Sequence, residues 1–82
     1  LQLTHSGRWA RVAGDSPVGQ ARGRAQPRVA FRHPLLDGRV GIDDDAAVLG
    51  DDEVEDLIAA FARAAYLAQQ EGFDFVDLKH CH

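Results

Sequence analysis

The feature that most constrains this chain is a stretch from about residue 51 to residue 70 whose apolar side chains recur every three or four positions. This spacing is that of one face of an α-helix, and it predicts a helix over about 51–70. The apolar face would consist of Val54, Leu57, Ile58, Phe61, Ala65 and Ala68. We expect the first four of these side chains to be buried against neighbouring strands.

Signals at both ends define the bounds of this helix. Asp51, Asp52 and Glu53 fall in its first turn, where carboxylates interact favourably with the positive end of the helix dipole. Gly50 precedes them as the expected N-cap. Gly72 follows the last apolar position and is expected to end the helix in a left-handed conformation.

Two short stretches with strand character flank this helix in the sequence. Residues 1–4 alternate apolar and polar side chains, and an apolar run returns at about 74–79. The order predicts a β-loop-α-β unit whose two strands are parallel neighbours. Because the chain begins inside a strand and contains no methionine, we expect residues 1–82 to be one partial domain, truncated at both ends.

The connection between the first strand and the helix, about residues 5–50, is predicted to be irregular. It contains all three prolines and most of the glycines, with turn signals at Ser16-Pro17, His33-Pro34 and Asp37-Gly38. Residues 28–31 are the only part in which we expect a short strand. Loops longer than about 12–15 residues within a compact domain are usually functional or disordered.

Charge and composition exclude several classes of function. Seven of the nine basic residues are arginines between Arg8 and Arg39, but they are scattered among Gly, Pro and Ala without a basic helix, so we expect no nucleic-acid partner. No stretch approaches the roughly 20 apolar residues of a membrane span. A single cysteine fits a reducing compartment, and we expect a cytoplasmic protein.

The strand at 74–79 differs in its two faces. Val76 and Leu78 are expected to point towards the helix, whereas Phe75, Asp77 and Lys79 point the other way. Charged residues are unusual on a buried parallel strand, which normally reads as a continuous apolar run. One place that tolerates them is the interior of a β/α barrel near its C-terminal rim, where active sites lie.

Two stretches of this sequence together resemble the Old Yellow Enzyme family of flavin-dependent NADH:flavin oxidoreductases and ene-reductases. The first is LQLTHSGR at residues 1–8, and the second is EGFDFVDLKHCH at residues 71–82. They are similar to the third and fourth strands of the family's (β/α)8 TIM barrel. The resemblance implies a fragment of such a barrel, FMN as cofactor, NADH or NADPH as electron donor, and a small-molecule substrate.

The resemblance also implies roles for individual residues. Gln2 matches the glutamine that hydrogen-bonds the polar edge of the flavin, and Thr4 matches a substrate-facing position. Lys79 and His82 match the pair that binds the substrate's carbonyl or nitro oxygen and stabilises the charge developing on it. Lys79 departs from the family pattern, which has histidine at this position. Asp77 on the same strand face would keep the ammonium group of Lys79 charged. Alternatively, Asp77 and Lys79 would form a purely structural ion pair.

Other interpretations of the same residues remain open. The parent protein is either an ene-reductase, a dienoyl-CoA reductase or amine dehydrogenase-like relative with an iron–sulfur domain downstream, or a degenerate barrel without catalytic activity. We expect no metal site at His80, Cys81 and His82, because adjacent residues rarely converge on one ion. Asp43, Asp44 and Asp45 read as a solvated turn rather than a calcium loop. The isolated 82-residue chain is expected to be inactive, and a homo-oligomer is possible for the full-length protein.

Overall fold

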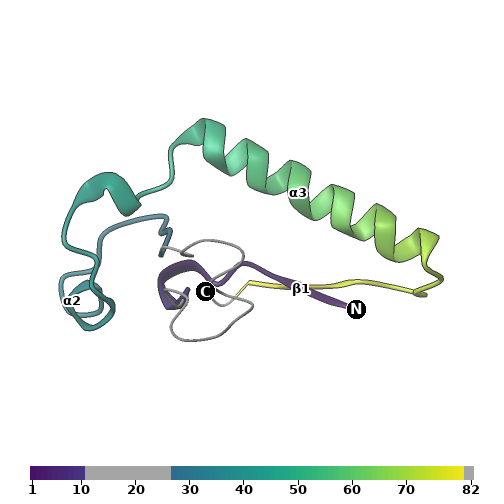
Figure 1. The fold of residues 1–82 in the computed structure, drawn as a ribbon, viewed down its shortest axis with the longest axis horizontal. Helices are drawn as coiled ribbons and strands as arrows, with labels where there is room; N and C mark the ends of the chain where they lie inside the picture. The colour runs from purple at the N-terminus through teal and green to yellow at the C-terminus, as the bar shows by residue number, and fades with distance from the viewer. Residues whose placement is uncertain (11–26, 81–82) are drawn as a thin grey trace, which may run out of the picture. The chain divides into compact units, whose positions relative to one another are not determined.

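The structure is a computed structural model that describes residues 1–10 and 27–80 (Figure 1). The described elements are β1 (Gln2–Thr4), the 3₁₀ turn η1 (Gly7–Trp9), α2 (Asp37–Val40), the 3₁₀ turn η2 (Asp45–Ala47), α3 (Asp51–Gln70) and β2 (Asp77–Lys79). They fall into two compact units. The strand–helix unit contains Leu1–His5 and Gly50–His82, and the loop unit contains Ser6–Leu49.

Helix α3 has the bounds that the sequence predicts, and its N-terminus is built as expected. Gly50 is the N-cap in an extended conformation, and its carbonyl accepts the first helical hydrogen bond, from the Val54 amide at 3.0 Å. Gly50 has no side chain, so only one half of a capping box is present: its own amide donates to Glu53 Oε2 at 3.0 Å. Asp51 and Asp52 also lie in this first turn, where their negative charges interact favourably with the helix dipole.

The C-terminus of α3 is a Schellman motif. Gly72 has a φ of +88°, and its amide donates to the Gln69 carbonyl at 3.1 Å while the Phe73 amide donates to the Ala68 carbonyl at 3.0 Å. These two bonds satisfy carbonyls that the helix end would leave unpaired. They also turn the chain back towards β2, so the left-handed conformation predicted for Gly72 is confirmed.

The apolar face of α3 is only partly covered. Ala68 is buried, whereas Leu57 and Phe61, which are predicted to be buried, are half-buried. Val54 and Ile58, by contrast, are 39% and 57% exposed, so the prediction that they are buried is wrong in this structure. A pair of strands about 4.8 Å apart is too narrow to cover the full apolar stripe of a helix that is about 10 Å across.

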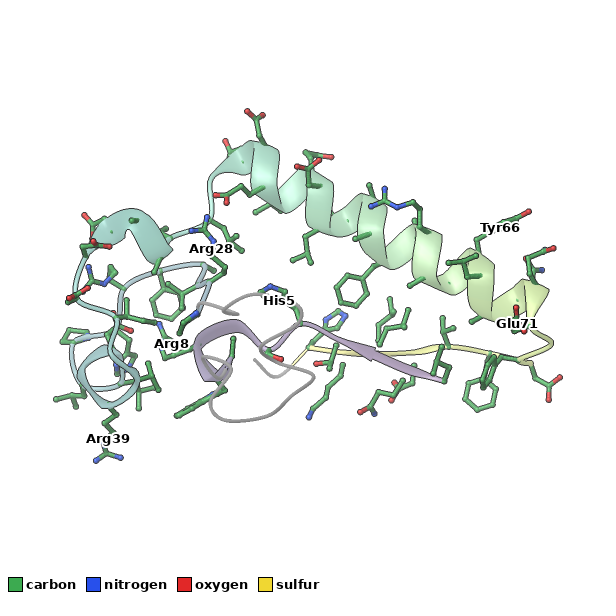
Figure 2. The ribbon with its side chains drawn as sticks, in the orientation of Figure 1. His5, Arg8, Arg28, Arg39, Tyr66 and Glu71 are labelled. Carbon is green, nitrogen blue, oxygen red and sulfur yellow. The ribbon has the colours of Figure 1, made fainter. Side chains whose placement is uncertain are left out.

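The strand pair is parallel, as predicted, but short. Its register aligns Gln2 with Asp77, Leu3 with Leu78 and Thr4 with Lys79. Strand β2 begins at Asp77 rather than near residue 74. Its pairing with the first strand starts where the Asp77 amide donates to the Leu1 carbonyl at 2.9 Å. Helix α3 runs along this pair within the strand–helix unit (Figure 1), and Tyr66 points away from the strands (Figure 2).

The loop unit is more ordered than the sequence suggests. Asp37-Gly38 begins helix α2 instead of forming an isolated turn, and η1 and η2 add two short 3₁₀ turns. The expected strand at 28–31 is reduced to one parallel bridge between Val29 and Val48. Val29 and Ile42 are 4% and 6% exposed and form the buried apolar part of the described loop unit. The predicted turn at residues 16 and 17 lies outside the described residues.

Candidate functional site

Four polar residues share one face of the β1–β2 pair, and we call this set the polar strand face. The parallel register sets Gln2 beside Asp77 and Thr4 beside Lys79. Because side chains alternate along a strand, all four lie on the face opposite to the register partners Leu3 and Leu78. The sequence predicts Asp77 and Lys79 on one face, and the register adds Gln2 and Thr4 to it.

The best-defined contact on the polar strand face joins its two strands. Gln2 Nε2 donates a hydrogen bond to Asp77 Oδ2 at 2.7 Å, although the two residues are 75 positions apart in the sequence. A carboxylate is an acceptor only, so the amide nitrogen must face it. The amide oxygen of Gln2 and its second N–H are thereby left to other partners.

Lys79 is half-buried at the end of β2, and it does not form an ion pair with Asp77. The structural pair left open by the sequence is therefore not formed here, and Asp77 accepts from Gln2. The Thr4 hydroxyl contacts only the adjacent His5 carbonyl, at a long 3.5 Å. Cys81 and His82 lie outside the described residues. His82, the second residue expected to bind the substrate's oxygen, therefore has no structural description.

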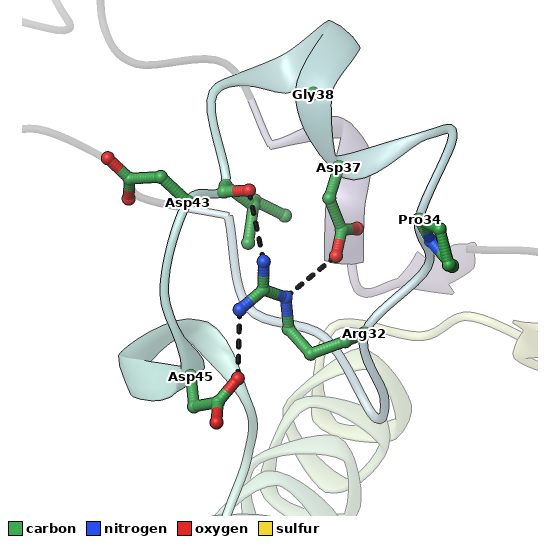
Figure 3. A pocket seen from close by; sticks show the side chains of 7 residues that line it. Arg32, Pro34, Asp37, Gly38, Asp43 and Asp45 are labelled. Carbon is green, nitrogen blue, oxygen red and sulfur yellow. Dashed lines mark hydrogen bonds and ion pairs between the residues drawn. The ribbon is translucent and has the colours of Figure 1, made fainter.

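A second polar cluster lies in the loop unit, and its centre, Asp37, was not identified from the sequence as a special residue. Arg8 Nε donates to Asp37 Oδ1 at 2.9 Å. Arg32 Nε donates to Asp37 Oδ2 at 2.8 Å (Figure 3). The His33 amide also donates to Oδ2, at 2.8 Å. Arg32 reaches further, to Asp45 Oδ1 at 2.8 Å. We call Arg8, Arg32, Asp37 and Asp45 the Asp37 cluster.

The Asp37 cluster holds a buried charge. The Asp37 side chain is 5% exposed, and the hydrogen bond from Arg32 is the main reason that its pKa falls from 3.8 to about 2. Burial acts in the opposite direction, but the His33 amide and the Arg8 guanidinium add to the lowering. The hydrogen bonds from Arg32 to Asp37 and Asp45 raise the pKa of Arg32 in turn.

The two arginines of the Asp37 cluster are occupied within the protein. Arg8 also donates to the Phe31 carbonyl at 2.8 Å and stacks over the Phe31 ring at 5.4 Å. Arg32 also donates to the Ile42 carbonyl at 3.4 Å. An open hollow of about 550 Å³ adjoins the cluster, lined by Arg32, Pro34, Asp37, Gly38, Ile42, Asp43 and Asp45. Arg32, the arginine that lines this hollow, pairs with both Asp37 and Asp45, so the cluster links separate parts of the described loop unit.

Asp44 has a structural role of its own. Its Oδ1 accepts from the Ala46 amide at 2.9 Å and caps η2. Within residues 1–10 and 27–80, no group of three or more His, Cys, Asp and Glu side chains is arranged to hold a metal ion.

No protein-family model matches this chain, and no curated protein or solved structure matches it either. In the part of the chain that the structure describes, none of the helices has the length and apolar character needed to cross a membrane.

Proposed function

We propose that this chain is part of an FMN-dependent NAD(P)H oxidoreductase that reduces an activated alkene or a similar small electrophile. In this proposal the β1–α3–β2 unit is one piece of a (β/α)8 barrel, and the polar strand face looks into the barrel interior. One observation supports it above the others: the β1–β2 register gathers Gln2, Thr4, Asp77 and Lys79 on a single face. Polar residues on both of two paired parallel strands are expected where strands line a site.

The polar side chains of this face suit a flavin and its substrate. Gln2 retains its amide oxygen as an acceptor and its second N–H as a donor after its bond to Asp77. The pyrimidine edge of a flavin alternates carbonyl acceptors with an N–H donor, so an amide is a complementary partner. Gln2 would therefore hold the polar edge of FMN, and Thr4 would face the substrate from the neighbouring position on β1.

Bound FMN would supply the hydride, and the protein would supply position and charge. Lys79 carries three N–H donors and a full positive charge. At the end of β2 its ammonium group would donate to the oxygen of the substrate's electron-withdrawing group, where negative charge develops. Such a donor stabilises the transition state more than the ground state. His82 would be the second donor to the same oxygen.

The test is to measure the two half-reactions of the full-length protein separately. Lys79→Met should slow oxidation of the reduced, FMN-loaded protein by an enone by about 10²–10³-fold, the size expected for one lost oxyanion donor. Reduction of the flavin by NAD(P)H should change much less, because no oxygen of an enone is present in that step. Arg63→Met is the matched control, since Arg63 is an exposed cation on α3.

Three outcomes would argue against the proposal. A full-length protein that does not bind FMN would refute it as a whole. Equal losses in both half-reactions, together with a lower melting temperature, would make Lys79 a structural residue. An effect of Arg63→Met as large as that of Lys79→Met would show that any lost cation slows the reaction.

A further inference from the structure

The hydrogen bond between Gln2 and Asp77 determines which way the Gln2 amide is turned. Its nitrogen and oxygen differ only in their hydrogen-bonding capacity, so the neighbours of a glutamine decide its orientation. Here the neighbour is a carboxylate, 2.7 Å from Gln2 Nε2. The reversed amide would set its own oxygen against a carboxylate oxygen, with no proton between them.

This bond is not needed to hold the strands together. The Asp77 amide already donates to the Leu1 carbonyl at 2.9 Å, and the N-terminal amine of Leu1 contacts the Phe75 carbonyl at 3.3 Å. Both side chains of the Gln2–Asp77 pair are exposed in this chain. A solvent-exposed side-chain hydrogen bond contributes little net stability, so its main consequence is the orientation of the amide.

We infer that Asp77 is a positioning residue that fixes the orientation of the Gln2 amide. In this orientation Gln2 offers its oxygen and its second N–H, side by side, to a ligand. The matching ligand edge is one in which an N–H adjoins a carbonyl. Such an edge belongs to imides and related heterocycles. The inference rests on the proposed function, in which the edge is the pyrimidine side of FMN. Asp77 acts through Gln2 and does not itself contact the ligand.

The experiment is a double-mutant cycle on FMN affinity in the full-length protein. The apoprotein of the wild type, Asp77→Ala, Gln2→Ala and the double variant are each titrated with FMN, with quenching of flavin fluorescence as the readout. Asp77→Ala should weaken FMN binding by about three- to tenfold, the equivalent of about one neutral hydrogen bond. In the Gln2→Ala background the same substitution should change the affinity by less than about twofold, because no amide remains to be positioned.

Asp77→Val provides a second variant that keeps strand propensity while removing the acceptor. It should reproduce the loss seen with Asp77→Ala, and it should shift the absorbance spectrum of bound FMN in the same direction as Gln2→Ala. A residue that only supported the fold would lower the melting temperature without producing this shared spectral change.

The outcomes separate this inference from the proposed function. Coupled losses, present only when Gln2 is present, support the inference. Equal losses in both backgrounds, or no loss in Asp77→Ala and Asp77→Val, overturn it while leaving FMN binding and the proposed function intact. A wild-type protein that does not bind FMN refutes the proposed function and, with it, the assignment of this ligand edge.

Discussion

Arg8 Nε lies 2.9 Å from Asp37 Oδ1, and this contact joins two residues of the loop unit that are 29 positions apart in the sequence. The same carboxylate receives Arg32 and the His33 amide on its other oxygen, so three donors from two parts of the segment converge on one buried group. The described part of the loop unit is therefore organised by contacts within that unit. Arg8 and Arg32 form these contacts.

Asp37→Asn should loosen the loop unit. The amide retains one acceptor oxygen but loses the charge that pairs with Arg8 and Arg32. Arg8 thereby loses its carboxylate partner, and Arg32 loses one of its two. Hydrogen–deuterium exchange of peptides from residues 27–49 in the full-length protein should become faster. Asp43→Asn is the matched control, because Asp43 lines the same hollow but is exposed. Equal exchange in the two variants would show that the Asp37 cluster does not hold the unit together.

The stability of the loop unit should depend on pH in the acid range. The pKa of Asp37 is lower in the folded state, about 2, than its ordinary value of 3.8. Asp37 therefore contributes its full stabilisation above pH 3.8, and this contribution is lost as the pH falls towards 2, because the unfolded chain binds the proton first. Thermal unfolding followed by circular dichroism should show a steeper loss of melting temperature in this window for the wild type than for Asp37→Asn. Identical slopes would contradict the ion pairing.

Gly72→Ala should destabilise the end of α3 through the backbone alone. Gly72 has a φ of +88°, while an added Cβ would meet no atom within 4 Å. The expected cost is about 1–2 kcal/mol, the penalty for an L-residue in the left-handed region. Gly38→Ala is the control, since Gly38 also has open space around it but no positive φ and lies in helix α2. That substitution should be neutral or stabilising, by up to about 1 kcal/mol. Urea unfolding of the full-length variants measures both.

Phe61→Ala should lower the free energy of unfolding by about 2–3 kcal/mol. This loss is at or below the lower end of the 3–5 kcal/mol that is typical of a fully buried phenylalanine. The reason is that Phe61 is half-buried. Arg63→Ala, two positions further along the helix and exposed, should change stability by no more than about 0.5 kcal/mol. A loss below about 1 kcal/mol for Phe61→Ala would place this side chain on the surface.

The local sequence determined the elements whose causes are themselves local. The bounds of α3 follow from the three- and four-residue apolar spacing, the acidic first turn and Gly72, all of which act within one or two helical turns. The parallel pairing of β1 and β2 follows from their order around a helix, and it required no knowledge of individual contacts. Asp77 and Lys79 share a face because strand side chains alternate.

The tertiary structure alone decided the contacts that join distant parts of the chain. Nothing near Asp37 in the sequence indicates that its carboxylate is buried, because its burial depends on Arg8, 29 positions away. Nothing near Asp77 shows that it binds Gln2 rather than Lys79, because that choice depends on the register between strands 75 residues apart. The exposure of Val54 and Ile58 depends likewise on how wide a sheet lies beneath α3. Local patterns specify elements within a few residues, whereas burial and partner choice are properties of surfaces that meet only after the chain has folded.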